Sequence, residues 1–290
     1  MEALVFLGCT VPVRNLNYEV SARGVAEALG VKLIDLPELG CCGYPLKSGD
    51  QGAALVLAAR ALAQAAATGL PLVPLCSACA GTLTEAAHHL DHDPAARAAV
   101  QQRLDQLGLT YRTGVRVRHL ARFLLEEVGL EAIAAKVVRP LTEFTFAPHY
   151  GCHFLKPSRV MGGLDDPEDP RSLARLIQAT GAKSLDYAKL KDCCGGGVLG
   201  ADEDLAGRMA GGKLGELTAA GVTALAVVCP FCNVMFEGQQ KAIAKRLGLE
   251  IKVPVVYLTQ ILGLALGLKP DELGFKLNRV KPKELLEAFK

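Results

Sequence analysis

Two kinds of hydrophobic pattern alternate along the chain. Short apolar runs, such as residues 3–8 and 72–75, are typical of buried strands, and longer segments with helical spacing, such as residues 19–29 and 52–67, lie between them. The resulting βαβα order favours an α/β fold whose sheets are mainly parallel and are covered by helices on both faces.

The remaining segments of these two kinds form two series. In the first half we expect strands at residues 31–35 and 115–119, and helices at residues 82–90, 94–107 and 120–128. In the second half we expect strands at residues 144–148, 225–228 and 255–258, a helix at residues 172–180, and an apolar helix that ends near residue 268. Because the second series repeats the order of the first, the sequence predicts an internal duplication. We expect two tandem Rossmann-like domains, residues 1–142 and 143–290, each with a mainly parallel sheet.

Composition and charge exclude several classes of protein. The net charge is only +2 over 290 residues, without a long basic block, so the electrostatic signature of a nucleic-acid-binding protein is missing. The N-terminus lacks the basic region of a signal peptide, and the longest uncharged stretches are too short for a membrane span or contain glycine and proline. We therefore expect a cytoplasmic chain without a membrane span or a nucleic-acid partner, in which thiols stay reduced and can bind metals.

The cysteines carry the strongest chemical signal. All ten fall into two sets of five with one arrangement, namely a single cysteine, an adjacent pair and a Cys-x-x-Cys. The spacers are 31 and 33 residues in the first set and 40 and 34 in the second. The first set is Cys9, Cys41, Cys42, Cys76 and Cys79, and the second is Cys152, Cys193, Cys194, Cys229 and Cys232. This regularity indicates two metal clusters rather than packing.

The placement of the cysteines supports convergence of each set. Each group follows an apolar strand or precedes a helix, and the carboxyl ends of parallel strands meet at one edge of a sheet. Helix N-termini at that edge favour thiolates and anionic clusters. Glycine follows both adjacent pairs, as Gly43 and Gly195, and it permits the turn that two neighbouring cysteines need to point at one cluster.

Spacing alone also leaves room for buried structural thiols or zinc sites. Free cysteines are often simply buried, and Cys-x-x-Cys is also a common zinc-binding motif. A structural zinc takes four ligands, which would leave a fifth cysteine in each set unexplained, and a cubane [4Fe–4S] cluster also usually takes four. Five cysteines indicate either a cluster of unusual construction or four ligands and one reactive thiol.

The duplicated pattern resembles the cysteine-rich CCG domain found in the B subunit of heterodisulfide reductase. The resemblance covers nearly the whole chain and extends to the residues around the cysteines, at positions 8–14, 229–232 and 254–260. It implies two noncubane [4Fe–4S] clusters, each held by the five cysteines of one set. It also implies a catalytic role, in which a disulfide is reduced or formed between the clusters. Electrons would come from an HdrC-like ferredoxin-type iron–sulfur subunit, and an HdrA-like flavin subunit would complete the complex.

A second interpretation belongs to the same resemblance. Similar CCG domains occur in non-catalytic electron-transfer subunits of lactate-, glycolate- or succinate-oxidising complexes. A single or incomplete cysteine motif would favour such a relay, whereas this chain has both copies complete.

Several residues outside the cysteines are candidates for the reaction. His149 and His153 bracket Cys152, and a histidine can supply the protons that thiolate products need. They could instead donate a hydrogen bond to a cluster sulfur or belong to the core. Four basic residues follow cluster cysteines and could neutralise cluster charge, bind an acidic substrate or simply lie at the surface: Arg14, Lys47, Lys156 and Arg159.

Overall fold

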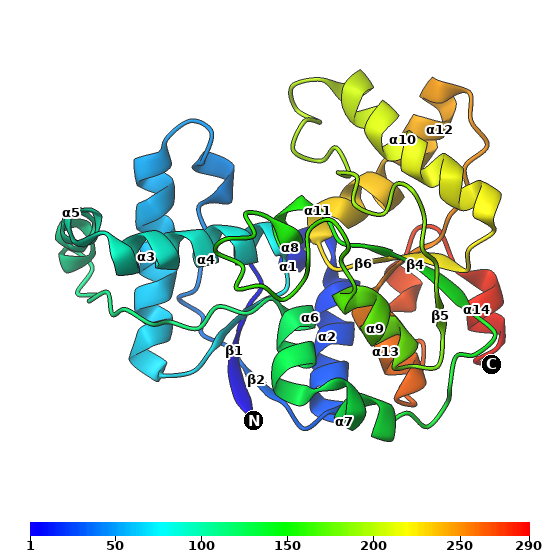
Figure 1. The fold of residues 1–290 in the computed structure, drawn as a ribbon, viewed down its shortest axis with the longest axis horizontal. Coiled ribbons are helices and arrows are strands. Elements are labelled where there is room, and N and C mark those ends of the chain that lie inside the picture. The colour runs from blue at the N-terminus through cyan, green and yellow to red at the C-terminus, as the bar shows by residue number, and fades with distance from the viewer.

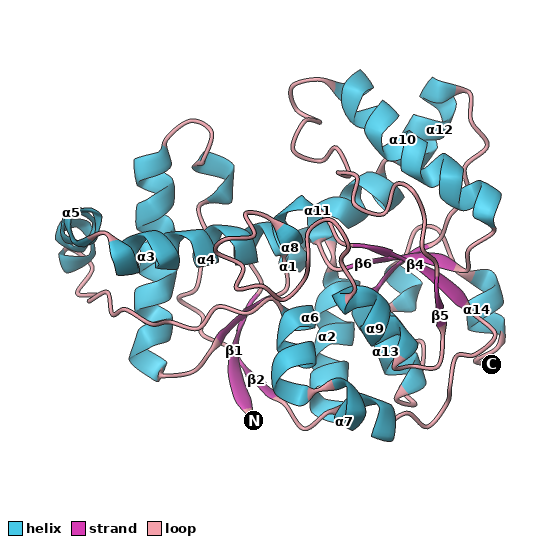
Figure 2. Ribbon diagram, in the orientation of Figure 1, coloured by secondary structure: helices cyan, strands magenta, loops and turns pink.

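The computed structural model describes residues 1–290 and contains two separate parallel sheets (Figures 1 and 2). The first has the order β2-β1-β3 and the second β5-β4-β6-β7, and every paired strand is parallel. The strands are β1 (Glu2–Phe6), β2 (Lys32–Ile34), β3 (Leu72–Pro74), β4 (Thr145–His149), β5 (Lys183–Ser184), β6 (Ala224–Val227) and β7 (Val255–Tyr257). The prediction of an α/β fold with duplicated, mainly parallel sheets is confirmed.

Helices account for most of the rest of the chain. Those of the first half are α1 (Val11–Arg14), α2 (Leu16–Ala28), α3 (Gln51–Thr68), α4 (Ser77–His92), α5 (Pro94–Asp105), α6 (Leu120–Phe123) and α7 (Leu130–Ala135). Those of the second half are α8 (Cys152–Leu155), α9 (Ser172–Gln178), α10 (Glu203–Ala220), α11 (Pro230–Asn233), α12 (Gln240–Leu247), α13 (Leu258–Ala265) and α14 (Lys283–Glu287). Short helical turns are η1 (Tyr44–Leu46), the π-helical η2 (Leu124–Val128) and η3 (Val234–Gly238), and η4 (Phe275–Leu277).

The duplication extends to the ends of the helices that follow the paired cysteines. Both α3 and α10 are 18 residues long. Asp50 and Asp202 cap their first turns by accepting backbone N–H groups, and Gly69 and Gly221 end them in the left-handed conformation. In Figure 1, α3 and α10 belong to two lobes on either side of the centre, where α1, α8 and α11 lie.

The predicted strand at residues 115–119 is not formed, and only a single bridge joins Val117 to Leu72. The Leu72 N–H donates to Arg116 and the Leu72 carbonyl accepts from Arg118, both at 2.9 Å. The next donor of this ladder would be Pro74, which has no N–H, so pairing stops. In the second half Val227 stands at that place, and β6 pairs with β7 over three residues.

Several elements of the second half were not expected from the sequence, among them β5, α10 and α12. β5 contains only two residues, too few to show a period. α10 contains four glycines and a lysine in its 18 residues, which interrupt the apolar stripe of an ordinary buried helix.

The two halves share one hydrophobic core. A continuous cluster of 76 buried residues includes side chains from both sheets. Helix α2 of the first half packs on α13 of the second, where the rings of Tyr18 and Tyr257 stack with centroids 4.0 Å apart. Between the same helices the hydroxyls of Ser21 and Thr259 lie 2.6 Å apart. The proposed boundary between residues 142 and 143 therefore separates two sequence repeats that are packed tightly together.

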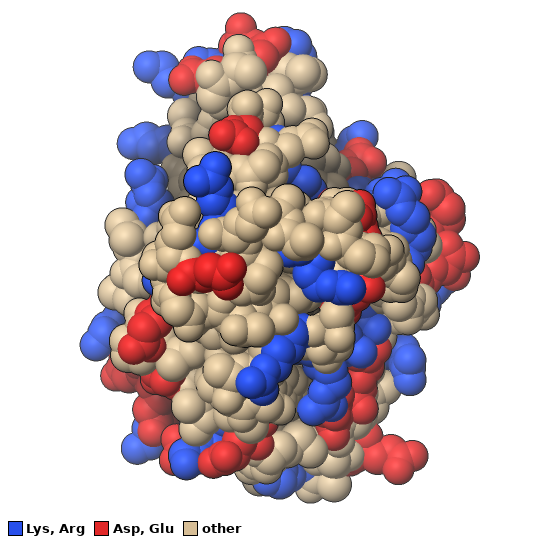
Figure 3. Space-filling model, turned by 90° about the vertical axis from the view of Figure 1, so that its left-hand side faces the viewer, with Lys and Arg blue, Asp and Glu red and all other residues tan.

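Charges on the outer surface are mixed. On the face that carries the first-half lobe, lysine and arginine are interspersed with aspartate and glutamate (Figure 3). None of the helices combines the length and the apolar character that crossing a membrane requires.

Candidate metal centre

The fold brings each set of cysteines to the carboxyl ends of its strands. Cys9 and Cys152 follow β1 and β4, while Cys76 and Cys229 are the residues that cap α4 and α11 directly after β3 and β6. Cys79 and Cys232 lie in the first turn of those helices, and the adjacent pairs lie in the loops before α3 and α10. These loops and helices meet near the centre of the molecule (Figure 1).

In the first set, the Cys42 thiol contacts the thiols of Cys79 and Cys41, and Cys79 also contacts Cys76. Contact with Cys79 lowers the pKa of the Cys42 thiol to about 7. Cys9 is exposed and completes the set near Cys41. A cavity with about 270 Å³ of empty volume lies among these thiols, and Phe231 of the second half forms part of its wall.

In the second set, the five thiols form a continuous chain. Cys193 contacts Cys152 and Cys194, and Cys232 contacts Cys194 and Cys229. Contact with Cys152, and then with Cys194, lowers the pKa of the Cys193 thiol below its usual range. His149 joins this set, because its Nε2 lies 3.2 Å from the Sγ of Cys232. The ligand atoms of His149, Cys194 and Cys232 all lie within 4.8 Å of one another.

The two sets touch each other. The Sγ atoms of Cys76 and Cys229 are 3.9 Å apart, although these residues are 153 positions apart in the sequence. This distance is about twice the length of a disulfide bond, and all ten cysteines are free thiols. The fold therefore joins nine free thiols into one connected group, and the exposed Cys9 lies near Cys41 at its edge.

Glycines shape the loops that carry the adjacent cysteine pairs. Gly43 and Gly195 have φ values of +89° and +79°, which other residues rarely adopt. A Cβ atom on Gly43 would lie 2.4 Å from the Ala54 carbonyl oxygen of α3, and one on Gly195 would lie 2.9 Å from that of Ala206 in α10. The N–H groups of these two glycines point at the Sγ atoms of Cys41 and Cys193, each over 3.4 Å. This arrangement fixes each pair and supplies N–H donors to its sulfur atoms.

The donor set fits a thiolate-ligated metal cluster. Convergent cysteine thiolates are the ligands that iron–sulfur clusters use, and hydrogen bonds from N–H groups to their sulfur atoms are part of such sites. The Tyr257 hydroxyl is buried without a protein partner, and burial, followed by the charges of Tyr18 and Cys229, raises its pKa. A buried O–H group without a protein acceptor can donate a hydrogen bond to a sulfur atom of a cluster.

His149 is held by a lysine that no sequence pattern singled out. The Nζ of Lys213, in α10, donates to His149 Nδ1 over 2.8 Å and to the carbonyl oxygens of Leu190 and Asp192 over 3.1 and 2.9 Å. Lys213 is completely buried, and burial lowers its pKa to about 8. Burial, followed by the Lys213 charge, lowers the pKa of His149 well below its usual value.

A signal for Lys213 is visible in the sequence once α10 is known. The buried face of α10 includes Ala206, Ala210, Leu214 and Leu217, spaced three or four residues apart. Lys213 lies on the same face, one position before Leu214, where an apolar residue would be ordinary. A lysine at such a place needs fixed partners.

His153 lies at the junction of the two sets. Its Nδ1 is 3.2 Å from the Sγ of Cys152, and its half-buried ring packs edge-on against Tyr44 of the first half at a centroid distance of 4.9 Å. Tyr44 also contacts Phe231, which lies between Cys229 and Cys232. Burial, followed by the charge of Cys152, raises the pKa of Tyr44 to about 12. Tyr44 was not predicted as a site residue, because nothing local distinguishes it.

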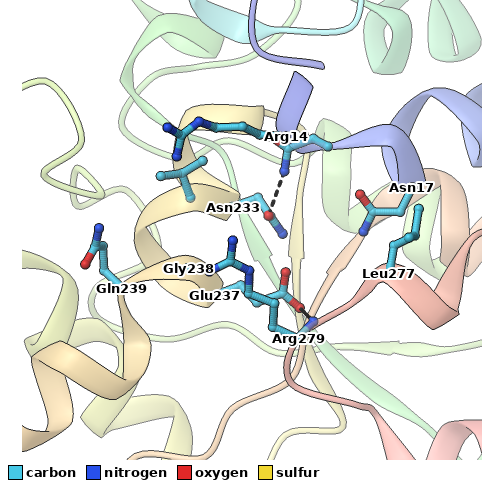
Figure 4. Close-up of a pocket in the computed structure, with 10 residues that line it drawn as sticks. Arg14, Asn17, Asn233, Glu237, Gly238, Gln239, Leu277 and Arg279 are labelled. Atoms are coloured by element: carbon cyan, nitrogen blue, oxygen red, sulfur yellow. Dashed lines mark hydrogen bonds between the residues drawn. The ribbon is translucent and has the colours of Figure 1, made fainter. Parts of the chain in front are cut away.

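The predicted basic residues lie around the centre without contacting the thiols. Arg14 lines a polar pocket with about 460 Å³ of empty volume, together with Asn233, Glu237 and Arg279 (Figure 4). In this pocket Asn15 donates to Asn233 over 2.8 Å, and Glu237 accepts the backbone N–H of Arg279 over 2.8 Å. Lys47 forms an ion pair with Glu85, and Lys156 and Arg159 are exposed.

Fold and site together define a duplicated α/β protein in which two sets of five cysteines meet between two parallel sheets. The family model described as "Cysteine-rich domain" (CCG) matches the chain twice, at residues 3–84 and 146–237. The chain is 36% identical over 286 residues to the B subunit of the ferredoxin/F(420)H(2)-dependent CoB-CoM heterodisulfide reductase of Methanosarcina acetivorans, with 97% of this chain and 95% of the relative covered. It therefore belongs to the family of duplicated CCG proteins that includes the B subunits of heterodisulfide reductases.

One further relative shows the breadth of this family, and one solved structure shows the breadth of the fold. The 8-methylmenaquinol:fumarate reductase membrane anchor subunit of Wolinella succinogenes is 30% identical, with 98% of this chain and 99% of the relative covered. The crystal structure of a hypothetical protein from Helicobacter pylori superposes with a TM-score of 0.79 at 19% identity, and covers 97% of this chain and 52% of that chain. The latter likeness shows the fold alone.

Proposed function

We propose that this chain is the catalytic iron–sulfur subunit of a heterodisulfide reductase or a related complex. Each set of five cysteines would hold one noncubane [4Fe–4S] cluster. The observation that carries the proposal is the contact between the sets at Cys76 and Cys229, 3.9 Å apart, since a disulfide has to be reached from both clusters at once. When bound, such clusters supply single electrons and iron sites that can hold a sulfur atom.

The substrate is proposed to be a disulfide between two different thiols. Its reduction breaks one S–S bond, consumes two electrons and two protons, and releases two thiols; the reverse reaction forms the bond. Phe231 and Tyr44 provide apolar walls next to both sets, and they would keep water from the sulfur atoms.

The two predicted histidines suit different tasks in this proposal. His153 is half-buried, contacts Cys152 and borders both sets, and these contacts support the proposal that it delivers a proton to a product thiolate. His149 is buried and has both ring nitrogens occupied, by Lys213 and Cys232. It is better placed to hold a cysteine sulfur than to exchange protons with solvent.

We further propose that electrons reach the chain from an HdrC-like ferredoxin-type subunit and an HdrA-like flavin subunit in the cytoplasm. This proposal is supported by the similarity to the Methanosarcina relative. That relative is named as a subunit of a reductase that depends on ferredoxin or F(420)H(2). The alternative is a relay that passes electrons without chemistry of its own. It is favoured by the similarity to the fumarate reductase anchor subunit over 98% of this chain.

Metal analysis of the anaerobically purified protein tests the clusters. We expect about eight irons and eight acid-labile sulfides per chain, since each [4Fe–4S] cluster contributes four of each. The variants C79S and C232S should each lose about half of the iron. Ser77→Ala, between Cys76 and Cys79, is the matched control and should keep it all. Two zinc ions per chain, or iron without sulfide, would overturn the assignment.

Turnover separates the reductase from the relay. The complex, supplied with an artificial electron donor and a panel of mixed disulfides, should release two thiols for each disulfide consumed. Clusters that reduce and reoxidise rapidly without releasing thiol from any disulfide would establish the relay instead.

A further inference from the structure

The second half of the molecule carries two polar side chains where the first half carries apolar ones. His149 stands two residues before Gly151, and Phe6 stands two residues before Gly8. Lys213 is the eleventh residue after the Asp202 cap of α10, and Ala61 is the eleventh after the Asp50 cap of α3. The duplicated framework is therefore the same, but the side chains next to the two cysteine sets differ.

The rings of Phe6 and His149 occupy equivalent places. A Cβ atom on Gly8 would lie 3.6 Å from Phe6 Cε1 and 2.9 Å from the Sγ of Cys79. A Cβ atom on Gly151 would lie 3.6 Å from His149 Nε2 and 3.5 Å from the Sγ of Cys232. Each ring thus lies beside the last cysteine of its own set, and only the second ring has an N–H to offer.

Lys213 carries an ammonium group that is held by three partners. Its lowered pKa, about 8, still lies above neutral pH. Its Nζ lies within 3.1 Å of His149 Nδ1 and of the Leu190 and Asp192 carbonyl oxygens, and an ammonium group can donate one N–H to each of them. The charge is buried between the rings of Tyr187 and Phe236, 5.6 and 5.8 Å from their centroids. The acidic groups that favour this charge most strongly are the Cys232 thiol and Asp192, followed by the thiols of Cys194 and Cys193. The second set therefore has a fixed positive charge that the first set lacks.

Lys213 also determines which nitrogen of His149 carries the proton. Because an ammonium group can only donate, His149 Nδ1 must accept, and the proton of the neutral ring is on Nε2. That Nε2–H points at the Sγ of Cys232 over 3.2 Å. The first set receives no such hydrogen bond from Phe6.

We propose that Lys213 and His149 raise the reduction potential of the second centre above that of the first, so that the first electron to enter the protein rests at the second set. The inference rests on the proposed function, since it requires clusters at both sets. Its physical basis is that a hydrogen bond to a ligand sulfur and a nearby positive charge stabilise the reduced, more negative state of a cluster. The reduction is a one-electron step, and the electron comes from the partner subunit.

Lys213 and His149 act through Cys232 and are positioning residues. Holding one electron at the second centre would let the second electron arrive while the substrate sulfur atoms are still bound. The duplicated fold therefore gives two centres of the same construction but of unequal potential.

Redox titration of the two centres, followed by electron paramagnetic resonance, tests the inference. In His149→Phe, which copies the first half, and in Lys213→Met, the ratio of reduced to oxidised second centre at a fixed potential should fall at least tenfold. A tenfold change corresponds to about 59 mV for a one-electron couple. The reduction potential of the first centre, which is the lower of the two, should not change.

Two variants distinguish a change of reduction potential from disruption of the site. His149→Gln can accept from Lys213 and donate to Cys232, and it should keep most of the wild-type potential. Lys189→Met removes an exposed positive charge that lies beside Asp192, and it should change neither step. If Lys213→Met loses iron, the comparison of His149→Phe with His149→Gln decides the question.

The outcomes distinguish this inference from the proposed function. Full iron content with unchanged potentials in His149→Phe would overturn the role of Lys213 and His149 and leave the clusters intact. Absence of iron and sulfide from the wild-type protein would overturn the proposed function itself.

Discussion

At the scale of single residues, His119 shows how a side chain outside the cysteine sets supports them. Its Nδ1 accepts the Ala121 N–H over 3.1 Å and so caps α6. Its Nε2 therefore carries the proton, and it donates to the carbonyl oxygen of Val228 over 2.9 Å, one residue before Cys229. Complete burial lowers the pKa of His119 to about 4 from the ordinary 6.5. The neutral ring thus ties the first half to the segment that carries a cysteine of the second.

This lowered pKa predicts a dependence of stability on pH. Between pH 6.5 and about 4 the unfolded chain binds a proton at His119 and the folded chain does not, so stability is lost as the pH falls. Between about pH 7 and pH 5, His119→Gln should lose roughly 2 kcal/mol less of its free energy of unfolding than the wild type does. Urea titration at the two pH values measures this difference. His88→Gln, at an exposed histidine, should behave like the wild type; equal pH dependence in all three proteins would contradict the assignment.

At the scale of secondary-structure elements, the close approach of a loop to a helix places each adjacent pair of cysteines. The loop at Gly43 contacts the backbone of α3 at Ala54, and the loop at Gly195 contacts α10 at Ala206. Both helices begin at an aspartate cap seven residues after the glycine, so the helix position and the loop position are fixed together. Any side chain larger than hydrogen would separate loop and helix and move the cysteines.

Gly43→Ala tests this contact. The substitution introduces a Cβ 2.4 Å from a backbone oxygen at φ +89°, so both strain and a steric clash are expected. Gly69→Ala is the matched control, since Gly69 has φ +70° and nothing within 4 Å. We expect the control to cost about 1 kcal/mol of unfolding free energy, and Gly43→Ala to cost roughly 2 kcal/mol more and to lower the iron content. Equal costs, with full iron content in both variants, would show that the loop can move.

At the scale of the whole molecule, each half covers the surface of the other that carries the cysteines and the helices α2 or α13. The stacked rings of Tyr18 and Tyr257, the paired hydroxyls of Ser21 and Thr259 and the thiols of Cys76 and Cys229 all join one half to the other. The core is correspondingly continuous through both sheets. The two repeats, with their expected boundary between residues 142 and 143, therefore share one core, and we expect them to fold as one unit.

Separate expression of the halves tests this unity. Residues 1–142 and 143–290, each produced alone, should lack a cooperative thermal transition, because each exposes the apolar surface that α2 and α13 bury together. Co-expression of the two halves should restore a complex with the melting behaviour of the intact chain. A sharp transition in either isolated half, measured by circular dichroism, would show that the halves are independent domains.

Most strands, most of the longer first-half helices and the grouping of the cysteines could be predicted because their signals are local. Apolar runs such as those of β1 and β6 are followed directly by glycine or cysteine, so the sequence shows where a strand ends and a thiol begins. The strand at residues 115–119 was predicted wrongly, because its pairing depends on a missing N–H at Pro74 in another segment. Lys213 and Tyr44 could not be assigned a role from the sequence, because the residues that they contact are far away along the chain.

The order of residues alone was enough to place two equal sets of five thiols at the carboxyl ends of parallel strands, because hydrophobic period, helix caps and cysteine spacing are properties of short segments. Only the folded chain shows that the two sets meet at Cys76 and Cys229. It alone also shows that Lys213 contacts His149, whose other ring nitrogen contacts Cys232. These contacts join residues 64 to 153 positions apart. They depend on how helices pack across both sheets, which no local pattern specifies.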